Sequence, residues 1–281
     1  MSEHLIEYLN EGIPVLKNFI GEDKPLCAII LGSGLNEFAN SLTDARFLAY
    51  KDVPHMKVST ATGHVGRFVL GTLPNVGARV LCMQGRLHGY EGNSSQEVAF
   101  PVWLMQACGV DTLVITNAAG AINPSYRVGD FCMMRDQINF TGRSPLTGVE
   151  PNMIAERFVP MKDAFDVQLR KVVAETARIE GVRVHEGVYL GDAGPAFETP
   201  AEVKMYGLWG ADTVAMSVCE EVIAARHVGM RVFGMSLITN MACGVEGGDP
   251  NSDDIMEVAT FAQERFAKLM RGLVAYLAEN R

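Results

Sequence analysis

The chain has 281 residues, of which 48% are hydrophobic and 20% charged, an ordinary composition for a soluble globular enzyme. Its net charge of −9 argues against binding to duplex DNA or to an acidic membrane surface. No apolar run approaches the roughly 18 residues of a membrane span, and no signal-peptide pattern is present, so we expect a cytoplasmic protein. Six scattered cysteines without a CxxC pair indicate reduced thiols rather than disulfides or a zinc site.

Short apolar runs alternate with segments of helical periodicity along the chain. The predicted strands span Cys27–Leu31, Arg79–Met83, Thr112–Thr116, Phe131–Arg135, Val184–Leu190, Thr213–Met216 and Val232–Thr239. The predicted helices span Leu5–Phe19, Gln96–Ala107, Ala164–Ile179, Pro200–Leu208, Glu221–His227 and Asp254–Ala278. Residues 1–281 therefore form a single predicted α/β domain with a largely parallel central sheet flanked by helices. The long irregular segments Gly142–Pro160 and Cys243–Asp253 are typical of functional or mobile loops.

The turn Gly32-Ser33-Gly34 follows the first predicted strand. Its backbone N–H groups and the serine hydroxyl suit a phosphate oxygen, although a plain tight turn could have the same sequence. Glu37 stands where a dinucleotide fingerprint needs its third glycine, and the Gly-Lys-Ser/Thr of a P-loop is absent.

A second cluster, Gln84–Gly92, follows another apolar strand. On an extended segment Arg86, His88 and Tyr90 share one face, and the arginine fork suits the oxygens of a tetrahedral anion. A solvated hairpin is the alternative, but polar groups of this kind at a strand end favour a binding site.

Other predicted strands also end in small or polar residues. These ends are Thr116–Gly120, Ala193–Thr199, Met216-Ser217 and Thr239-Asn240. In open α/β sheets, ligands bind beyond the carboxyl ends of the strands. The set offers anion donors, an aromatic plate and an amide beside a carboxylate, which fits a ligand with a phosphate at one end and a flat hydrogen-bonding ring at the other.

These segments resemble, in order, motifs of the trimeric purine nucleoside phosphorylases. They are Gly32-Ser33-Gly34, Gly63-His64, Gln84–Gly92, Thr116–Gly120, Gly194–Thr199, Met216-Ser217 with Glu221-Val222, and Ile238-Thr239-Asn240. The resemblance runs from about Pro25 to the C-terminal helix. It implies a mixed, partly barrel-like sheet between helices and the reversible phosphorolysis of purine nucleosides in purine salvage. It also implies no metal and no organic cofactor, with inorganic phosphate as a co-substrate.

The resemblance further implies a role for each matching residue. The implied phosphate ligands are Ser33, Arg86, His88, Ser217 and the Ala118 N–H, with His64 on a loop that closes over phosphate. The implied ribose contacts are Tyr90, Met216 and Phe158, the last lent to a neighbouring subunit of a homotrimer. The implied base contacts are Phe197, Glu198, Thr239 and Asn240, and we count Asn240, Glu198 and His88 as catalytic.

These residue types suit the implied reaction. When a glycosidic bond breaks, the sugar becomes positive and the purine negative, so a phosphate held by fixed donors can stabilise the cation and then attack it. Asn240 can donate to O6 and accept from N7–H, while Glu198 can accept from N1–H. We therefore expect 6-oxopurine nucleosides, inosine and guanosine with xanthosine as a further candidate, to be preferred over adenosine.

Two positions depart from the family pattern. Many members have a histidine shortly before the last helix that contacts the ribose 5′-hydroxyl. Residues 251–255 of this chain, Asn-Ser-Asp-Asp-Ile, contain no histidine. Either Asp253 or Asp254 makes that contact, or recognition of the 5′ position is looser. Glu220 stands where many relatives have proline, and we expect it to be solvated.

Three other functions compete with this interpretation. A methylthioadenosine phosphorylase would have aspartate in place of Asn240. A nucleoside hydrolase would need an aspartate cluster for calcium. A purine-binding protein without activity would have no reason to keep the anion donors.

Overall fold

The computed structural model describes residues 4–61, 63–249 and 252–280, and of residues 252–256 only the backbone. In this part of the chain, nine strands form one mixed sheet in the order β2-β3-β4-β1-β5-β8-β7-β6-β9. The strands are β1 (Ala28–Leu31), β2 (Thr43–Ala49), β3 (Arg67–Leu73), β4 (Ala78–Gln84), β5 (Thr112–Ala121), β6 (Phe131–Asn139), β7 (Val184–Gly191), β8 (Thr213–Ala215) and β9 (Arg231–Met241). Because β9 also pairs with β5, the strands β5, β8, β7, β6 and β9 close into a ring. The predicted mixed and partly barrel-like sheet is confirmed.

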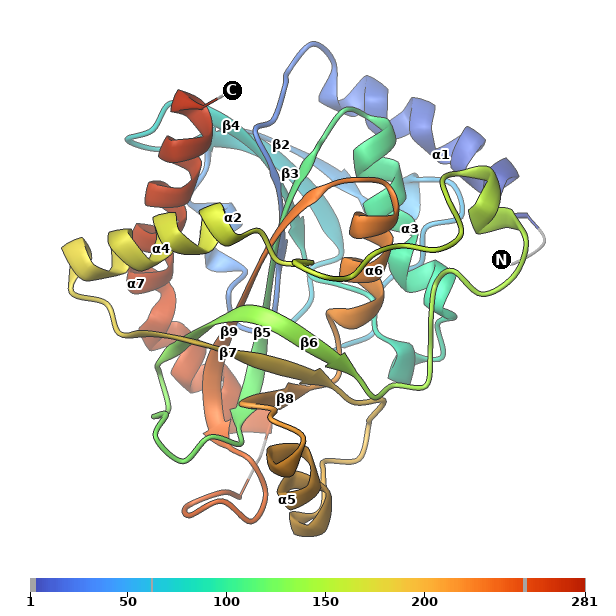
Figure 1. The fold of residues 1–281 in the computed structure, drawn as a ribbon. Helices are drawn as coiled ribbons and strands as arrows, with labels where there is room; N and C mark the ends of the chain where they lie inside the picture. The colour runs from blue at the N-terminus through green and yellow to red at the C-terminus, as the bar shows by residue number, and fades with distance from the viewer. Residues whose placement is uncertain (1–3, 62, 250–251, 281) are drawn as a thin grey trace.

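Helices cover both faces of the sheet (Figure 1). The helices α1 (Leu5–Ile20), α3 (Ser95–Ala107) and α6 (Cys219–His227) lie on one side. The helices α2 (Glu37–Asn40), α4 (Val167–Glu180) and α7 (Ser252–Glu279) lie on the other, while α5 (Pro200–Leu208) packs beside β8. Short 3₁₀ turns occur at η1 (Tyr50–Asp52), η2 (Gly89–Glu91) and η3 (Glu150–Met153).

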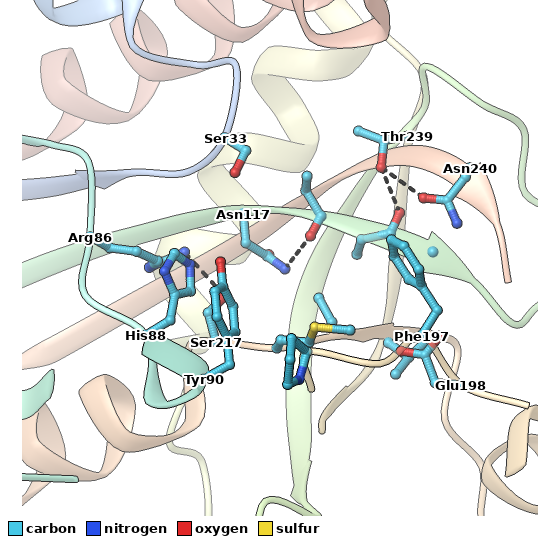
Figure 2. Close-up of a pocket in the computed structure, with 17 residues that line it drawn as sticks. Ser33, Arg86, His88, Tyr90, Asn117, Phe197, Glu198, Ser217, Thr239 and Asn240 are labelled. Atoms are coloured by element: carbon cyan, nitrogen blue, oxygen red, sulfur yellow. Dashed lines mark hydrogen bonds between the residues drawn. The ribbon is translucent and has the colours of Figure 1, made fainter. Parts of the chain in front are cut away.

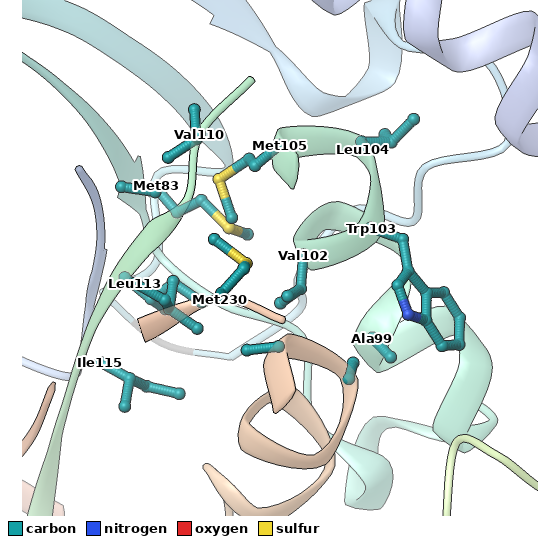
Figure 3. Close-up of a cluster of buried hydrophobic side chains, with 14 of the residues drawn as sticks. Met83, Ala99, Val102, Trp103, Leu104, Met105, Val110, Leu113, Ile115 and Met230 are labelled. Atoms are coloured by element: carbon teal, nitrogen blue, oxygen red, sulfur yellow. The ribbon is translucent and has the colours of Figure 1, made fainter. Parts of the chain in front are cut away.

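Two apolar layers hold these helices on the sheet. On one face, Met83 and Leu113 of the strands meet Val102 and Met105 of α3 and the nearby Met230 (Figure 3). On the other face, α7 buries a stripe at spacings of three and four, as its sequence predicts: Ala262, Phe266, Leu269 and Leu273. The sheet is therefore packed between two helical layers, which hold the strand ends in fixed positions.

All seven predicted strands and all six predicted helices are present, with ends shifted by a few residues, but β2, β3 and the short helix α2 were not predicted. Most side chains of β2 are exposed, so its sequence lacks an apolar run. In β3, Gly71 interrupts the apolar pattern, although a Cβ there would lie 2.7 Å from Leu42 Cβ. The glycine marks a close approach of two segments rather than a break in the strand.

No helix among the described residues is long and apolar enough to cross a membrane. All six cysteines have free thiols.

Candidate active site

A cavity of about 280 Å³ opens where β1, β4, β5, β8 and β9 end (Figure 2). The sequence-predicted residues that line it are Ser33, Arg86, His88, Tyr90, Ala118, Phe197, Glu198, Met216, Ser217, Thr239 and Asn240. His64 and Phe158 are the predicted site residues outside this lining. Side chains from segments more than 200 positions apart are thus brought to one place by the sheet.

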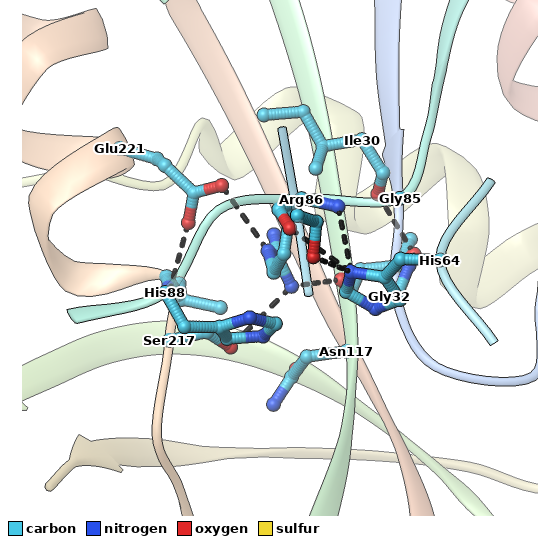
Figure 4. Close-up of polar contacts among 12 residues, drawn as sticks. Ile30, Gly32, His64, Gly85, Arg86, His88, Asn117, Ser217 and Glu221 are labelled. Atoms are coloured by element: carbon cyan, nitrogen blue, oxygen red, sulfur yellow. Dashed lines mark hydrogen bonds and ion pairs between the residues drawn. The ribbon is translucent and has the colours of Figure 1, made fainter. Parts of the chain in front are cut away.

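Arg86 is buried at one end of the cavity, with 1% of its surface exposed. Its Nε donates to Glu221 Oε1 at 3.1 Å, and its Nη1 donates to Thr116 O at 2.6 Å and approaches Ser217 Oγ at 3.4 Å (Figure 4). Its Nη2 is buried without a hydrogen-bond partner among the described residues. A buried guanidinium N–H without a partner is costly, so this group is poised for an anion.

The turn that carries Ser33 lies directly against β5. The Gly32 N–H donates to Thr116 Oγ1 at 3.1 Å, and a Cβ on Gly32 would lie 2.5 Å from the Asn117 Cα. No larger residue fits there. Glycine therefore lets this turn approach the end of β5 and places Ser33 over the cavity beside Ala118.

Ser217 sits just before α6 on a constrained backbone. Val218 has a φ of 76°, which is rare for a β-branched residue. Its N–H donates to Glu221 Oε2 at 3.0 Å, and the Tyr189 hydroxyl donates to Ser217 O at 2.7 Å. Glu221 thus links two predicted phosphate ligands, because its other carboxylate oxygen holds Arg86.

His88 is held by a carboxylate three residues later. The His88 N–H donates to Glu91 Oε1 at 2.9 Å, and its Nδ1 lies 2.8 Å from the same oxygen. Burial opposes ionisation of Glu91, but hydrogen bonds from His88 and Thr60 prevail and lower its pKa to about 2. The His88 ring stacks on Tyr90 at 4.6 Å, so this turn presents an imidazole and a phenol together.

His64 lies behind the cavity rather than in its lining. Its Nδ1 lies 3.1 Å from Arg86 N and 2.9 Å from Arg86 O, and its ring stacks on His88 at 5.1 Å. Burial and the charges of His88 and Arg86 lower the pKa of His64 to about 4. Its Nε2 is buried without a partner among the described residues, beside the predicted anion ligands.

A β-bulge shapes the opposite end of the cavity. In the pairing of β5 with β9, Ile238 lies opposite Ala119 and Asn240 lies opposite Gly120, so Thr239 is an extra residue. A Cβ on Gly120 would lie 3.0 Å from Asn240 Nδ2. The bulge and the glycine together let two consecutive polar side chains line one cavity.

The polar groups at this end match a flat heterocycle. Thr239 Oγ1 donates to Asn240 Oδ1 at 3.0 Å, and Asn240 Nδ2 donates to Met241 O at 3.0 Å. Glu198 is 7% exposed, and burial raises its pKa. Phe197, 46% exposed, stands at the same end as an aromatic wall.

One prediction from the sequence was wrong, and two others are not tested by the described part of a single chain. Glu220 is not solvated: it is 4% exposed and pairs with Arg143, so that expectation was wrong. Phe158 is 86% exposed on the long segment after β6 and does not reach the cavity of its own chain. The proposed 5′-hydroxyl contacts, Asp253 and Asp254, lie outside the described side chains.

Three site residues, Glu221, Glu91 and Asn117, have no role predicted from the sequence. Glu221 and Glu91 hold other site groups, since Glu221 binds Arg86 and Glu91 binds His88. Asn117 lines the cavity itself, and its Oδ1 accepts from Ser236 Oγ at 2.8 Å. Glu91 lies within Gln84–Gly92, and Glu221 lies in the Glu221-Val222 pair of the family motif. A carboxylate in a motif that also supplies an arginine or histidine is the sequence signal that could have predicted their roles.

Comparison with known proteins identifies the family of this chain. Residues 27–275 match the model of the phosphorylase superfamily, and the chain belongs to that family. Purine nucleoside phosphorylase 1 of Geobacillus stearothermophilus is 40% identical, over 99% of this chain and 98% of that protein. The bovine purine nucleoside phosphorylase is 41% identical, over 90% of each chain. Within the superfamily, the chain is a member of the purine nucleoside phosphorylases.

Solved structures extend this similarity to the whole fold. Schistosoma mansoni purine nucleoside phosphorylase in complex with adenosine has a TM-score of 0.89 and 34% identity, covering 96% of this chain and 97% of that one. The same enzyme in complex with inosine has a TM-score of 0.88, also at 34% identity, covering 96% of each chain. The resemblance of the sequence to this family is confirmed.

Proposed function

We propose that this protein catalyses the reversible phosphorolysis of purine nucleosides and prefers 6-oxopurines. The observation that carries the proposal is Arg86, whose Nη2 is buried without a partner in a cavity that ends in Glu198 and Asn240. An anion at the first end and a purine at the second would satisfy both sets of polar groups. The ribose would then lie between them, beside Tyr90 and Met216.

Phosphate binding comes first in this mechanism. Arg86 would donate from Nη2, with Ser33, Ser217, His88 and the Ala118 N–H as further donors around the anion. These donors are already held in place, so the phosphate oxygen would be positioned below C1′ at little further entropic cost. If His64 accepts from the Arg86 N–H through Nδ1, its neutral ring carries the proton on Nε2 and can donate to phosphate.

Cleavage then moves charge in opposite directions. The C1′–N9 bond breaks, its electron pair goes to the purine, and a phosphate oxygen bonds to C1′ to give α-(deoxy)ribose 1-phosphate. As N7 of the leaving purine takes a proton from solvent, Asn240 would accept from that N7–H and donate to O6. Glu198 would accept from N1–H, which only a 6-oxopurine carries in its neutral form.

Inosine tests the reaction directly. Purified protein should release hypoxanthine and ribose 1-phosphate only when inorganic phosphate is present. Release of free ribose without phosphate would identify a hydrolase instead. If inosine, guanosine and xanthosine are all inert while methylthioadenosine reacts, the base assignment is wrong; binding without any turnover would indicate a purine-binding protein.

Substrate range and assembly belong to the same proposal. The complex of the Schistosoma mansoni relative with adenosine concerns binding, whereas the preference proposed here concerns turnover. We further propose a homotrimer in which Phe158 completes a neighbouring site, a cytoplasmic location, a role in purine salvage, and activity without metal or organic cofactor. The high exposure of Phe158 supports the shared site.

A further inference from the structure

We infer that Arg143 and Glu220 form a clamp that positions the turn carrying His88 and Tyr90, an inference that rests on the proposed function. Arg143 lies in the segment after β6, and Glu220 lies in the first turn of α6. Arg143 Nε donates to Glu220 Oε1 at 2.9 Å, and only 5% of the Glu220 side chain is exposed. Burial of a carboxylate carries a desolvation penalty that its ion pair only partly offsets, so this pair is weak as a source of stability and a positioning role better explains it.

The same guanidinium holds both ends of the turn at η2. Its Nη2 donates to Asn93 O at 2.6 Å, just beyond the turn. Its flat face covers Gly89, which stands between His88 and Tyr90: a Cβ on Gly89 would lie 2.8 Å from Arg143 Cζ. Asn93 Nδ2 in turn donates to His88 O at 3.0 Å. Arg143 therefore fixes the turn from outside, in addition to the contacts that Glu91 makes with His88 within it.

The clamp joins this turn to the helix that positions the other anion ligands. Glu220 and Glu221 are adjacent at the start of α6, and each binds an arginine from a different segment: Arg143 and Arg86 respectively. Ser217 stands just ahead of the same helix. One short helix thus sets the distance between His88 on the turn and the Arg86 and Ser217 groups. Arg143 and Glu220 are positioning residues, because neither lines the cavity.

Arg143→Ala removes the clamp and is the main test. Arg143→Lys and Glu220→Gln are milder variants that fold more readily. Arg143→Ala should raise the KM for phosphate about 10-fold or more, since small displacements of aligned groups cost that much. Glu220→Gln keeps an acceptor for Arg143 Nε, so its KM for phosphate should stay close to that of wild type. The readout is the KM for phosphate well below the melting temperature, where lost stability alone leaves KM unchanged.

Arg231→Ala is the matched control. It also removes an arginine from a partly buried carboxylate, Asp166 at 2.8 Å, but at the start of β9, whose other end carries Asn240. It should lower the melting temperature and leave the KM for phosphate within about twofold of wild type, as distant surface pairs have only local effects.

Gly89→Ala opens the clamp without removing a charge. The new methyl group would displace the Arg143 guanidinium, so this variant should raise the KM for phosphate as Arg143→Ala does. In an Arg143→Ala background the same methyl group meets no guanidinium and should add little. The inference would be overturned if the effects of Gly89→Ala and Arg143→Ala on the KM for phosphate were additive. It would also be overturned if Arg143→Ala had the same KM for phosphate as Arg231→Ala. An inactive wild-type enzyme would instead refute the proposed function.

Discussion

The side-chain amide of Asn240 is oriented by a neighbour. Its Oδ1 accepts from Thr239, and its Nδ2 donates to the Met241 carbonyl. These two hydrogen bonds fix which side of the Asn240 amide carries the oxygen acceptor and which carries the nitrogen donor toward a purine base. A carboxylate at this position could keep the hydrogen bond from Thr239 but could not donate to O6.

Asn240→Asp should reverse the base preference. Adenosine offers a 6-amino donor to the new carboxylate, whereas inosine would face an acceptor with its O6. We expect the ratio of kcat/KM for adenosine to that for inosine to rise about 100-fold, because unmatched polar groups in a site are strongly rejected. The KM for phosphate should be unchanged, and an unchanged ratio would show that Asn240 does not select the base.

Glu198 should give the reaction an acid limb. Burial chiefly, with the charges of Asp192 and Glu202, raises the pKa of Glu198 above its ordinary 4.5, and the charged carboxylate is a stronger acceptor for N1–H than the protonated acid. As pH falls through that raised pKa, kcat/KM for inosine should fall. His64, with a pKa of about 4, stays neutral at higher pH. Glu198→Gln should be slower throughout and lose this limb, so a limb that persists in the variant would point to another group.

The turn at η2 depends on ionised Glu91. The pKa of Glu91 is lowered from 4.5 to about 2, so folding favours its charged form. Its stabilising contribution is complete above pH 4.5 and is lost as pH falls towards 2. The melting temperature of Glu91→Gln should thus be below that of wild type at neutral pH, and the gap should close in acid. A gap that is constant with pH would mean that charge is not involved.

Helix α7 contributes stability through one face only. Phe266 is fully buried and makes an edge contact with Phe38 at 5.3 Å between ring centroids, while Phe261 on the same helix is 74% exposed. Phe266→Ala should cost about 3–5 kcal/mol of unfolding free energy. Phe261→Ala is the matched control and should change it by less than about 0.5 kcal/mol. Denaturant unfolding of the two variants measures the difference.

The sequence predicts elements well where they bury apolar residues on a regular period. It does not predict β2, most of whose side chains are exposed, nor the extension of β5 and β9 beyond their apolar runs, which depends on their pairing with each other. The ligand-facing groups could be predicted because their types are unusual at strand ends. Their supports could not, since Glu220 and Arg143 are 77 positions apart and are joined only by the fold.

The whole assembly can be tested through Phe158. As an exposed residue in a single chain, it should tolerate Phe158→Ala without loss of subunit stability, yet nucleoside binding should weaken if it completes a neighbouring site. In the proposed homotrimer, mixing this variant with Arg86→Ala subunits would give some sites with both an intact cavity and an intact borrowed phenylalanine. Activity should reappear on subunit exchange. Mixtures no more active than their components would argue against a shared site.

Ring closure also bears on how the molecule behaves at high concentration. With one end of the sheet closed on itself, β2 is the free edge among the described strands. Its register shifts between Thr43 and Arg46, Asp44 has a φ of 49°, and most of its side chains are exposed and include charges. An irregular, charged edge is a poor template for a strand from another copy. The molecule therefore presents little surface for β-sheet aggregation, even when it is crowded.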